Sequence, residues 1–228
     1  MTLLETRTLD IAIGERILCK GLDWSINTHE RWAILGTNGA GKTTLLHTLA
    51  GLRKPRRGEV VLNGTTLTQL TRRAIAQQIG VLPQDSSDPF PATVWETVLM
   101  GRHPHLNPWS GESEADIQQA RDAMTRCGLT GWEQRAIATL SGGERRRVAL
   151  ATLLAQNPAL LLLDEPANHL DLRHQADLFA LMNELCGNGH AAVMVLHDPN
   201  HALRHCTHAL LLHGDGRWET GSCEQLLT

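Results

Sequence analysis

Short apolar runs are the most regular feature of the hydrophobic pattern along this chain. They do not alternate with polar positions, as a strand with one solvated face would. Uninterrupted apolar runs are typical of strands covered on both faces, as in a parallel sheet. We therefore expect buried strands of an α/β sheet at Trp32–Leu35, Ile79–Leu82, Leu160–Leu163 and Ala192–Leu196.

Helical spacing of apolar residues appears between these runs. It predicts helices at Lys42–Ala50, Glu144–Gln156 and Leu172–Leu185. Residues 2–13 and 59–63 differ, because their strand-like patterns are shorter and suggest a small antiparallel layer. Alternation of strands and helices indicates the α/β class.

The segment of about residues 86–140 has a different character. It is punctuated by Pro89, Pro91, Pro104, Pro108 and Gly111. Ser113-Glu-Ala-Asp116 resembles a capping box, and helical spacing follows at Ile117, Ala120, Met124 and Cys127. We expect an inserted helical subdomain between two parts of one core, at about 1–85 and 141–228.

Composition narrows the class of protein. The chain has 228 residues, 42% of them hydrophobic, and a net charge of −3, which argues against a nucleic-acid-coating protein. No apolar run approaches the roughly 20 residues of a membrane helix, and Glu5 and Asp10 interrupt any signal-peptide pattern. We expect a cytosolic protein, whose five cysteines lack C-x-x-C spacing and are reduced.

A phosphate-binding motif follows the first core strand. Gly36-Thr-Asn-Gly-Ala-Gly41-Lys42-Thr43 fits the pattern G-x-x-x-x-G-K-[ST]. Glycines allow backbone N–H groups to converge on phosphate oxygens, and the following helix offers its positive end. Lys42 is expected to reach the β- and γ-phosphates of ATP, and Thr43 to bind Mg²⁺. The residues expected to bind the nucleotide here are Gly36, Asn38, Gly39, Ala40, Gly41, Lys42, Thr43 and Thr44.

Two carboxylates end the strand Leu160–Leu163. The strand delivers Asp164 to the carboxyl edge of the sheet, beside the phosphate loop. Asp164 is expected to hold Mg²⁺ there, and Glu165 to polarise an attacking water. The two motifs together predict an ATPase.

A third motif, Leu140-Ser-Gly-Gly-Glu144, resembles the signature sequence of ABC ATPases. The order and spacing of the three motifs resemble an ABC transporter ATP-binding subunit over essentially all of residues 1–228. This resemblance implies an α/β fold with a P-loop NTPase core, a mixed sheet, a small antiparallel β layer and an inserted α-helical subdomain.

Further roles follow from the resemblance. Gln84 resembles the Q-loop glutamine, which contacts Mg²⁺ or the water and links to the membrane partner. His197 resembles the switch histidine that contacts the γ-phosphate, and Asn168-His-Leu-Asp171 resembles the D-loop. Catalytic roles are therefore expected for Glu165, His197 and Gln84.

The resemblance also implies a mechanism that needs two chains. Ser141, Gly142 and Gly143 would face the γ-phosphate of ATP held by a second copy, so that two ATP molecules lie in a head-to-tail dimer. Closing and opening of the dimer would move transmembrane permease subunits. One departure concerns adenine, since the chain has no tyrosine to stack on the base. Ile13 or Ile17 is expected to contact it instead.

A subfamily is suggested by the stretch Thr93–Pro104. It resembles ATPases of importers for iron-siderophores, haem and cobalamin. An importer subunit would lie peripherally on the cytoplasmic face of the inner membrane, with an outer substrate-binding protein as a further partner and no nucleic acid. An exporter ATPase and a soluble ABC protein of the translation or repair type remain alternatives.

A histidine pattern near the end of the chain allows a second hypothesis. If residues after Asp198-Pro199 are helical, His201, His205 and His208 share a face and could bind a transition metal, with His197 one turn earlier. The alternative is a surface helix without bound metal.

Overall fold

A mixed six-stranded sheet lies at the centre of the computed structural model, which describes residues 1–84, 91–107, 111–168 and 170–228. The β10–β9 pair is antiparallel, whereas every other neighbouring pair is parallel. The strand order is β10 (Trp218–Ser222), β9 (His208–Leu212), β3 (Arg31–Gly36), β8 (Ala191–Val195), β7 (Leu160–Asp164) and β6 (Ile79–Leu82). All four core strands expected from the sequence are confirmed.

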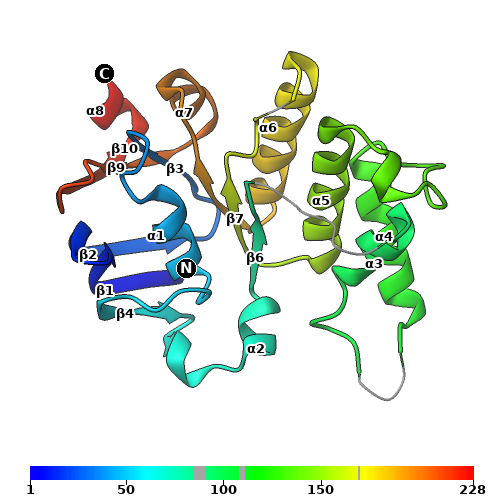
Figure 1. Ribbon diagram of the computed structural model, residues 1–228, viewed down its shortest axis with the longest axis horizontal. Coiled ribbons are helices and arrows are strands. Elements are labelled where there is room, and N and C mark those ends of the chain that lie inside the picture. Colours follow the sequence, from blue (N-terminus) through cyan, green and yellow to red (C-terminus); the bar gives the residue numbers. More distant parts are fainter. Residues whose placement is uncertain (85–90, 108–110, 169) are drawn as a thin grey trace.

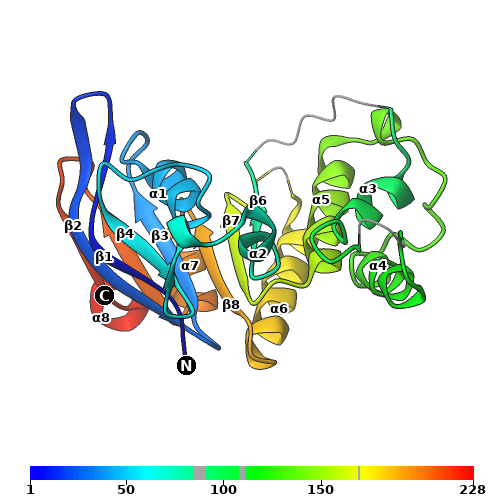
Figure 2. The same cartoon turned by 90° about the horizontal axis from the view of Figure 1, so that it is seen from below.

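A second, antiparallel sheet lies beside the first at one end of the molecule (Figures 1 and 2). Its order is β2 (Arg16–Asn27), β1 (Thr2–Ile13), β4 (Arg57–Leu62) and β5 (Thr65–Thr66). The antiparallel layer expected from residues 2–13 and 59–63 is thus confirmed. The long strand β2 was not anticipated, because a register shift opposite Cys19 and Leu22 interrupts its alternation of buried and exposed positions.

Helices occupy both sides of the central sheet. Those near it are α1 (Lys42–Leu49), α2 (Arg72–Ala76), α6 (Leu172–Gly187), α7 (Pro199–His205) and α8 (Cys223–Leu227). A helical layer at the opposite end from the antiparallel sheet contains α3 (Val94–Met100), α4 (Glu114–Arg126) and α5 (Gly142–Gln156) (Figure 1). Single 3₁₀ turns occur at Leu67–Gln69 and Ile137–Thr139. None of the described helices is both long and apolar enough to cross a bilayer.

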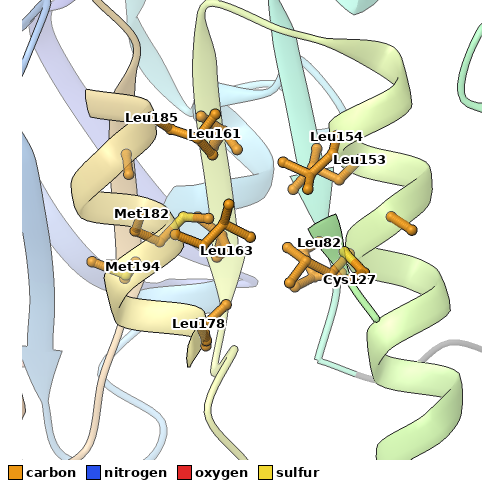
Figure 3. Close-up of a cluster of buried hydrophobic side chains, with 14 of the residues drawn as sticks. Leu82, Cys127, Leu153, Leu154, Leu161, Leu163, Leu178, Met182, Leu185 and Met194 are labelled. Atoms are coloured by element: carbon orange, nitrogen blue, oxygen red, sulfur yellow. The ribbon is translucent and has the colours of Figure 1, made fainter. Parts of the chain in front are cut away.

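Strand β7 shows why its sequence does not alternate. Leu161 and Leu163 pack between α5 and α6, with Leu153 and Met182 among their neighbours (Figure 3). Leu160 and Leu162 belong to the cluster on the other face, together with residues of α1. Burying each leucine contributes about 1.5–3 kcal/mol, so the four positions of β7 before Asp164 favour an apolar residue.

The helical layer is joined by polar contacts as well as apolar ones. Ser113 and Asp116 form the expected capping box at the start of α4. Arg102 follows α3, and its Nε donates to Asp116 Oδ1 at 2.9 Å while its Nη1 donates to the Ala155 carbonyl of α5 at 2.8 Å. A Cβ on Gly101 would lie 2.2 Å from the Thr152 carbonyl, so α3 meets α5 closely only with glycine there. Within Thr93–Pro104, several residues therefore have packing roles. The expectations for residues 86–90 and 108–110 lie outside the described residues.

The histidine hypothesis is corrected by the fold. Asp198 caps α7 and Pro199 is its first residue, as expected, but the helix ends at His205. His208 lies in β9 and stacks on Trp32 with ring centroids 4.7 Å apart, whereas His201 and His205 stack on Phe179. The three imidazoles do not share a helix face, and no metal-binding group of three or more His, Cys, Asp or Glu occurs among the described residues.

Candidate functional site

The phosphate loop joins β3 to α1, as the motif predicted. Gly41 caps α1 with φ of 101°, and a Cβ there would lie 2.8 Å from Leu18 Cδ1. A Cβ on Gly36 would lie 2.4 Å from the Leu212 carbonyl. Both positions therefore require glycine, because a side chain would collide with the packed core or demand a left-handed backbone. The loop presents the start of an eight-residue helix to the cavity.

Lys42 lies folded over this loop. Its Nζ donates to the carbonyls of Gly36 at 2.8 Å and Thr37 at 3.1 Å, and the residue is 6% exposed. Burial lowers the pKa of Lys42, although Glu165 and Asp164 oppose this shift by their charge. The ammonium group is thus held at the phosphate loop by weak neutral acceptors that a phosphate oxygen could replace.

Asp164 is fully buried at the end of β7. Neither of its carboxylate oxygens has a hydrogen-bond partner among the described residues. Burial raises the pKa of Asp164, while the nearby Thr43 hydroxyl, His47 and Arg146 oppose the shift. Buried carboxylate oxygens without a partner are costly, so this site favours a cationic ligand.

Glu165 is the most constrained side chain of the site. Its Oε2 accepts a hydrogen bond from Gln84 Nε2 at 3.0 Å and another from Asn168 Nδ2. Its Oε1 lies 2.6 Å from His197 Nε2. The carboxylate is 11% exposed, and the backbone is left-handed with φ of 47°. Gln84, Glu165 and His197, which come from three strand ends, are therefore brought together.

One cavity of about 390 Å³ unites most of the expected residues. It is lined by Ile13, Asn38, Gly39, Gly41, Lys42, Thr43, Thr44, Gln84, Glu165 and His197. A larger cavity of about 570 Å³ lies between α5 and α6 and contains no phosphate-loop residue. We assign the chemistry to the smaller cavity, because the charged and phosphate-binding groups converge there.

Ile13, at the end of β1, forms the apolar part of this cavity. It is 53% exposed and borders the phosphate loop across the cavity. Ile17 pairs with Ala12 across the hairpin and does not line the cavity. Of the two isoleucines considered from the sequence, Ile13 is the one placed to contact a base.

The signature residues lie outside this cavity. Ser141, Gly142 and Gly143 form the start of α5 and do not line the cavity that contains Lys42 and Glu165. Ser141 accepts from Glu144 N at 3.3 Å, and Glu144 Oε2 accepts from Ser141 N at 2.7 Å, which makes a capping box. Ser141 and Gly142 are exposed.

Two residues of the site were not identified from the sequence. Asn168 was expected only as part of the D-loop, but its amide contacts Glu165, three residues earlier. Arg146 of α5 donates to backbone carbonyls beside Gln84 and Glu165. The i+3 spacing after Glu165 could have indicated Asn168, whereas nothing distinguishes Arg146 from the neighbouring Arg145 and Arg147 in the sequence.

Comparison with known proteins agrees with this geometry. The family described as ABC transporter matches residues 19–168. The chain is 34% identical over 229 residues to the iron(3+)-hydroxamate import ATP-binding protein of Bacillus subtilis, covering 100% of this chain and 85% of the relative. It is 40% identical over 217 residues to the hemin import ATP-binding protein of Gloeobacter violaceus, covering 92% and 78%.

Solved structures share the whole fold. An ATP-binding subunit of an ABC transporter superposes with a TM-score of 0.87 at 25% identity, covering 98% of this chain and 91% of that one. The ATP-bound structure of a bacterial Atm1-family exporter gives 0.84 at 26%, covering 99% and 39%. The fold of this chain thus also occurs in an exporter. The family match, the relatives and the solved structures show that the chain belongs to the ABC transporter ATP-binding family, whose members are ATPases coupled to transport.

Proposed function

We propose that this chain is the energy-coupling ATPase of a membrane importer whose cargo is an iron chelate, haem or cobalamin. The observation that carries the ATPase part is the convergence of Lys42 and Glu165 on one cavity, with the buried carboxylate of Asp164 beside them. The importer part is supported by relatives that are named for the import of iron hydroxamates and hemin. Cobalamin enters only through the family resemblance.

The residues fit a magnesium ion bound with ATP. Asp164 offers buried carboxylate oxygens without hydrogen-bond partners among the described residues, and Thr43 and Gln84 supply neutral oxygens nearby. Oxygen ligands of this kind suit Mg²⁺. When bound, the ion would neutralise charge on the β- and γ-phosphates.

The chain's own residues would carry out the remaining steps. The N–H groups of the phosphate loop and Lys42 bind the phosphates, with Lys42 exchanging its carbonyl acceptors for phosphate oxygens. Glu165 polarises the attacking water and accepts its proton. Gln84 and His197 orient that carboxylate, and His197 is also available to the γ-phosphate.

A second copy of the chain would complete each site. Ser141, Gly142 and Gly143 stand outside the cavity at the exposed start of α5, where a phosphate from another subunit could bind. In this proposal two ATP molecules are held between head-to-tail protomers. Hydrolysis weakens that interface, and the opening motion is passed to permease subunits in the inner membrane.

The proposed organisation is one ABC ATPase domain over 1–228, with a core of about 1–85 and 141–228 and a helical subdomain of about 86–140. The subunit would attach peripherally to the cytoplasmic face of the membrane through the permease. An outer substrate-binding protein would deliver the cargo. An exporter ATPase is the second candidate, because the ATP-bound exporter shares the fold over 99% of this chain.

The first test is Mg-ATP hydrolysis by the wild type, Glu165→Gln and the control Glu112→Gln. We expect Glu165→Gln to lose at least about 100-fold in kcat, as for removal of a catalytic base, and to keep ATP binding. It should elute as a dimer in ATP, which the wild type forms only transiently. Glu112 is exposed and lies outside the phosphate-binding, signature and carboxylate motifs, so its variant should match the wild type.

Two results would contradict the proposal. Full activity in Glu165→Gln would remove the catalytic assignment. Purification from membranes without any polytopic partner would instead favour a protein that works apart from a permease. Proteoliposomes that contain the complex would separate an importer from an exporter. An importer takes up a radiolabelled ferric hydroxamate, whereas an exporter expels the same compound.

A further inference from the structure

Arg146 lies in α5 and is 8% exposed, although it carries a full positive charge. Its Nη2 donates to the carbonyls of Asp164 at 2.7 Å and Glu165 at 3.1 Å. Its Nη1 donates to the carbonyls of Pro83 and, at 3.2 Å, Gln84. One guanidinium group therefore reaches the backbone just after β6 and at the end of β7.

These four acceptors are the first carbonyls after the β6–β7 ladder stops, at a point where Asp164 still pairs with Val195 of β8. The parallel pairing of β6 with β7 ends at Leu82 and Leu163. Beyond that point the two chains separate toward the cavity, and buried carbonyls need new donors. A planar guanidinium with several N–H groups can satisfy both chains at once, whereas a lysine ammonium cannot match that geometry.

We propose that Arg146 is a positioning residue for ATP hydrolysis. From its place on α5, it holds the backbone that carries Gln84 and Glu165. Gln84 Nε2 and Glu165 Oε2 are 3.0 Å apart, so small backbone shifts would alter their contact. The bond to the Glu165 carbonyl also supports a left-handed residue, which is a sparsely populated conformation.

The same contacts connect the start of α5 with the strand ends that carry Gln84 and Glu165. Ser141 lies five positions before Arg146, at the N-cap of the same helix. This part of the inference rests on the proposed function, in which the start of α5 binds ATP of a second copy. Movement of α5 toward that nucleotide would shift Arg146, and with it the strand ends that hold Gln84 and Glu165.

Neighbouring arginines provide a matched control. Arg147 is in the same helical turn, and its guanidinium lies 4.9 Å from the Trp132 ring centroid, in the helical layer. Arg145 donates to the carbonyls of Leu140 and Ala138. Neither has a described hydrogen bond to the ends of β6 or β7, so Arg147→Gln changes the charge of α5 without touching the proposed contacts.

The experiment measures Mg-ATP hydrolysis, affinity for a fluorescent ATP analogue and thermal unfolding for the wild type, Arg146→Gln, Arg146→Lys and Arg147→Gln. We expect both Arg146 variants to lose about 10–100-fold in kcat, as for a misplaced catalytic group, with KM and analogue affinity within about twofold of the wild type. Arg147→Gln should keep its kcat. In Arg146→Ala, millimolar guanidinium chloride should restore part of kcat and should not activate Glu165→Gln.

Unchanged kcat in Arg146→Gln would overturn the inference. An equal loss in Arg147→Gln, or a loss of nucleotide binding parallel to the loss of kcat, would show only a structural role and would also overturn it. If Arg146→Gln does not fold, Arg146→Lys and the guanidinium rescue of Arg146→Ala decide the question. Wild-type kcat in Arg146→Lys, together with no rescue of Arg146→Ala, would overturn the inference. A wild type without ATPase activity would overturn the proposed function, and this inference with it.

Discussion

Glu165 has a strained backbone conformation, and three side chains contact its carboxylate. Its φ of 47° is uncommon for a residue other than glycine, and such conformations persist where surrounding contacts impose them. Here those contacts come from Gln84, Asn168 and His197. The cost of the conformation is consistent with a site that is organised before the nucleotide binds.

Ile13 is the residue at which this site differs from the aromatic stacking expected for the family. We predict that Ile13→Tyr lowers the Kd for ATP by about tenfold, because stacking a base on an aromatic ring contributes about 1–3 kcal/mol. Isothermal titration calorimetry with ATP measures this change. Inorganic tripolyphosphate, which has no base, should bind both proteins equally. Equal ATP affinity of Ile13→Tyr and the wild type would show that the base lies elsewhere.

Among the elements, α5 serves two functions. It packs against α3 and α4, and through Arg146 it contacts the ends of β6 and β7. Its first turn carries the signature residues, whose N-cap is Ser141. Helix α5 therefore connects the helical layer to the sheet. Arg102, which follows α3, pairs with Asp116 of α4 and donates to the Ala155 carbonyl of α5, so it joins the three helices.

That pair gives a prediction for the start of α4. Hydrogen bonds from Ser113, followed by Arg102, lower the pKa of Asp116 to about 2. We predict that Asp116→Asn lowers the free energy of unfolding by about 2 kcal/mol at pH 7, because the variant loses both the ionised carboxylate that the fold stabilises and its pair with Arg102. Urea unfolding at a series of pH values measures this difference.

The sign of the pH dependence follows from the direction of the shift. A carboxyl whose folded pKa lies below its unfolded value stabilises the fold fully above about pH 4, and this contribution is lost as the pH falls toward 2. The gap between wild type and Asp116→Asn should therefore be constant from pH 7 to about 4 and shrink below. Asp122→Asn, on an exposed position of α4, is the control. A gap that does not change with pH would refute the charge-based explanation.

In the whole molecule, the cavity beside the phosphate loop and the signature residues at the start of α5 lie in different regions. Residues that follow β3, β6, β7 and β8 line the cavity, whereas Ser141 is the N-cap of α5, a helix of the helical layer. Neither region by itself surrounds a nucleotide. This separation is the structural reason for proposing that a second copy closes the site.

The dimer gives the prediction at this scale. In the Glu165→Gln background, Ser141→Arg should still bind ATP through Lys42 and its loop but should elute as a monomer, because the long side chain fills the space at the start of α5 that the nucleotide of the second copy would occupy. Ser113→Arg is the matched control, since Ser113 caps α4 with the same type of capping box. Light scattering with ATP measures both. Dimers of the Ser141→Arg variant would exclude the signature turn from the interface.

The sequence alone determined the buried strands, the phosphate loop and the position of Asp164 and Glu165 at the end of a core strand. Local rules suffice there, because glycine, lysine and two carboxylates at fixed spacing each have a direct chemical reason. The same rules missed β2, whose alternation is interrupted by a register shift, and extended α7 to His208, although that residue lies in β9. Bulges and helix ends depend on partners that are distant in sequence.

Only the tertiary structure decided which equivalent residues act together. It separated Arg146 from Arg145 and Arg147, and it selected Ile13 over Ile17 at the cavity. It also assigned part of the Thr93–Pro104 stretch to packing between α3, α4 and α5. Residue type and spacing are properties of the chain, whereas burial and hydrogen-bond partners arise from the meeting of strands and helices that the chain keeps far apart.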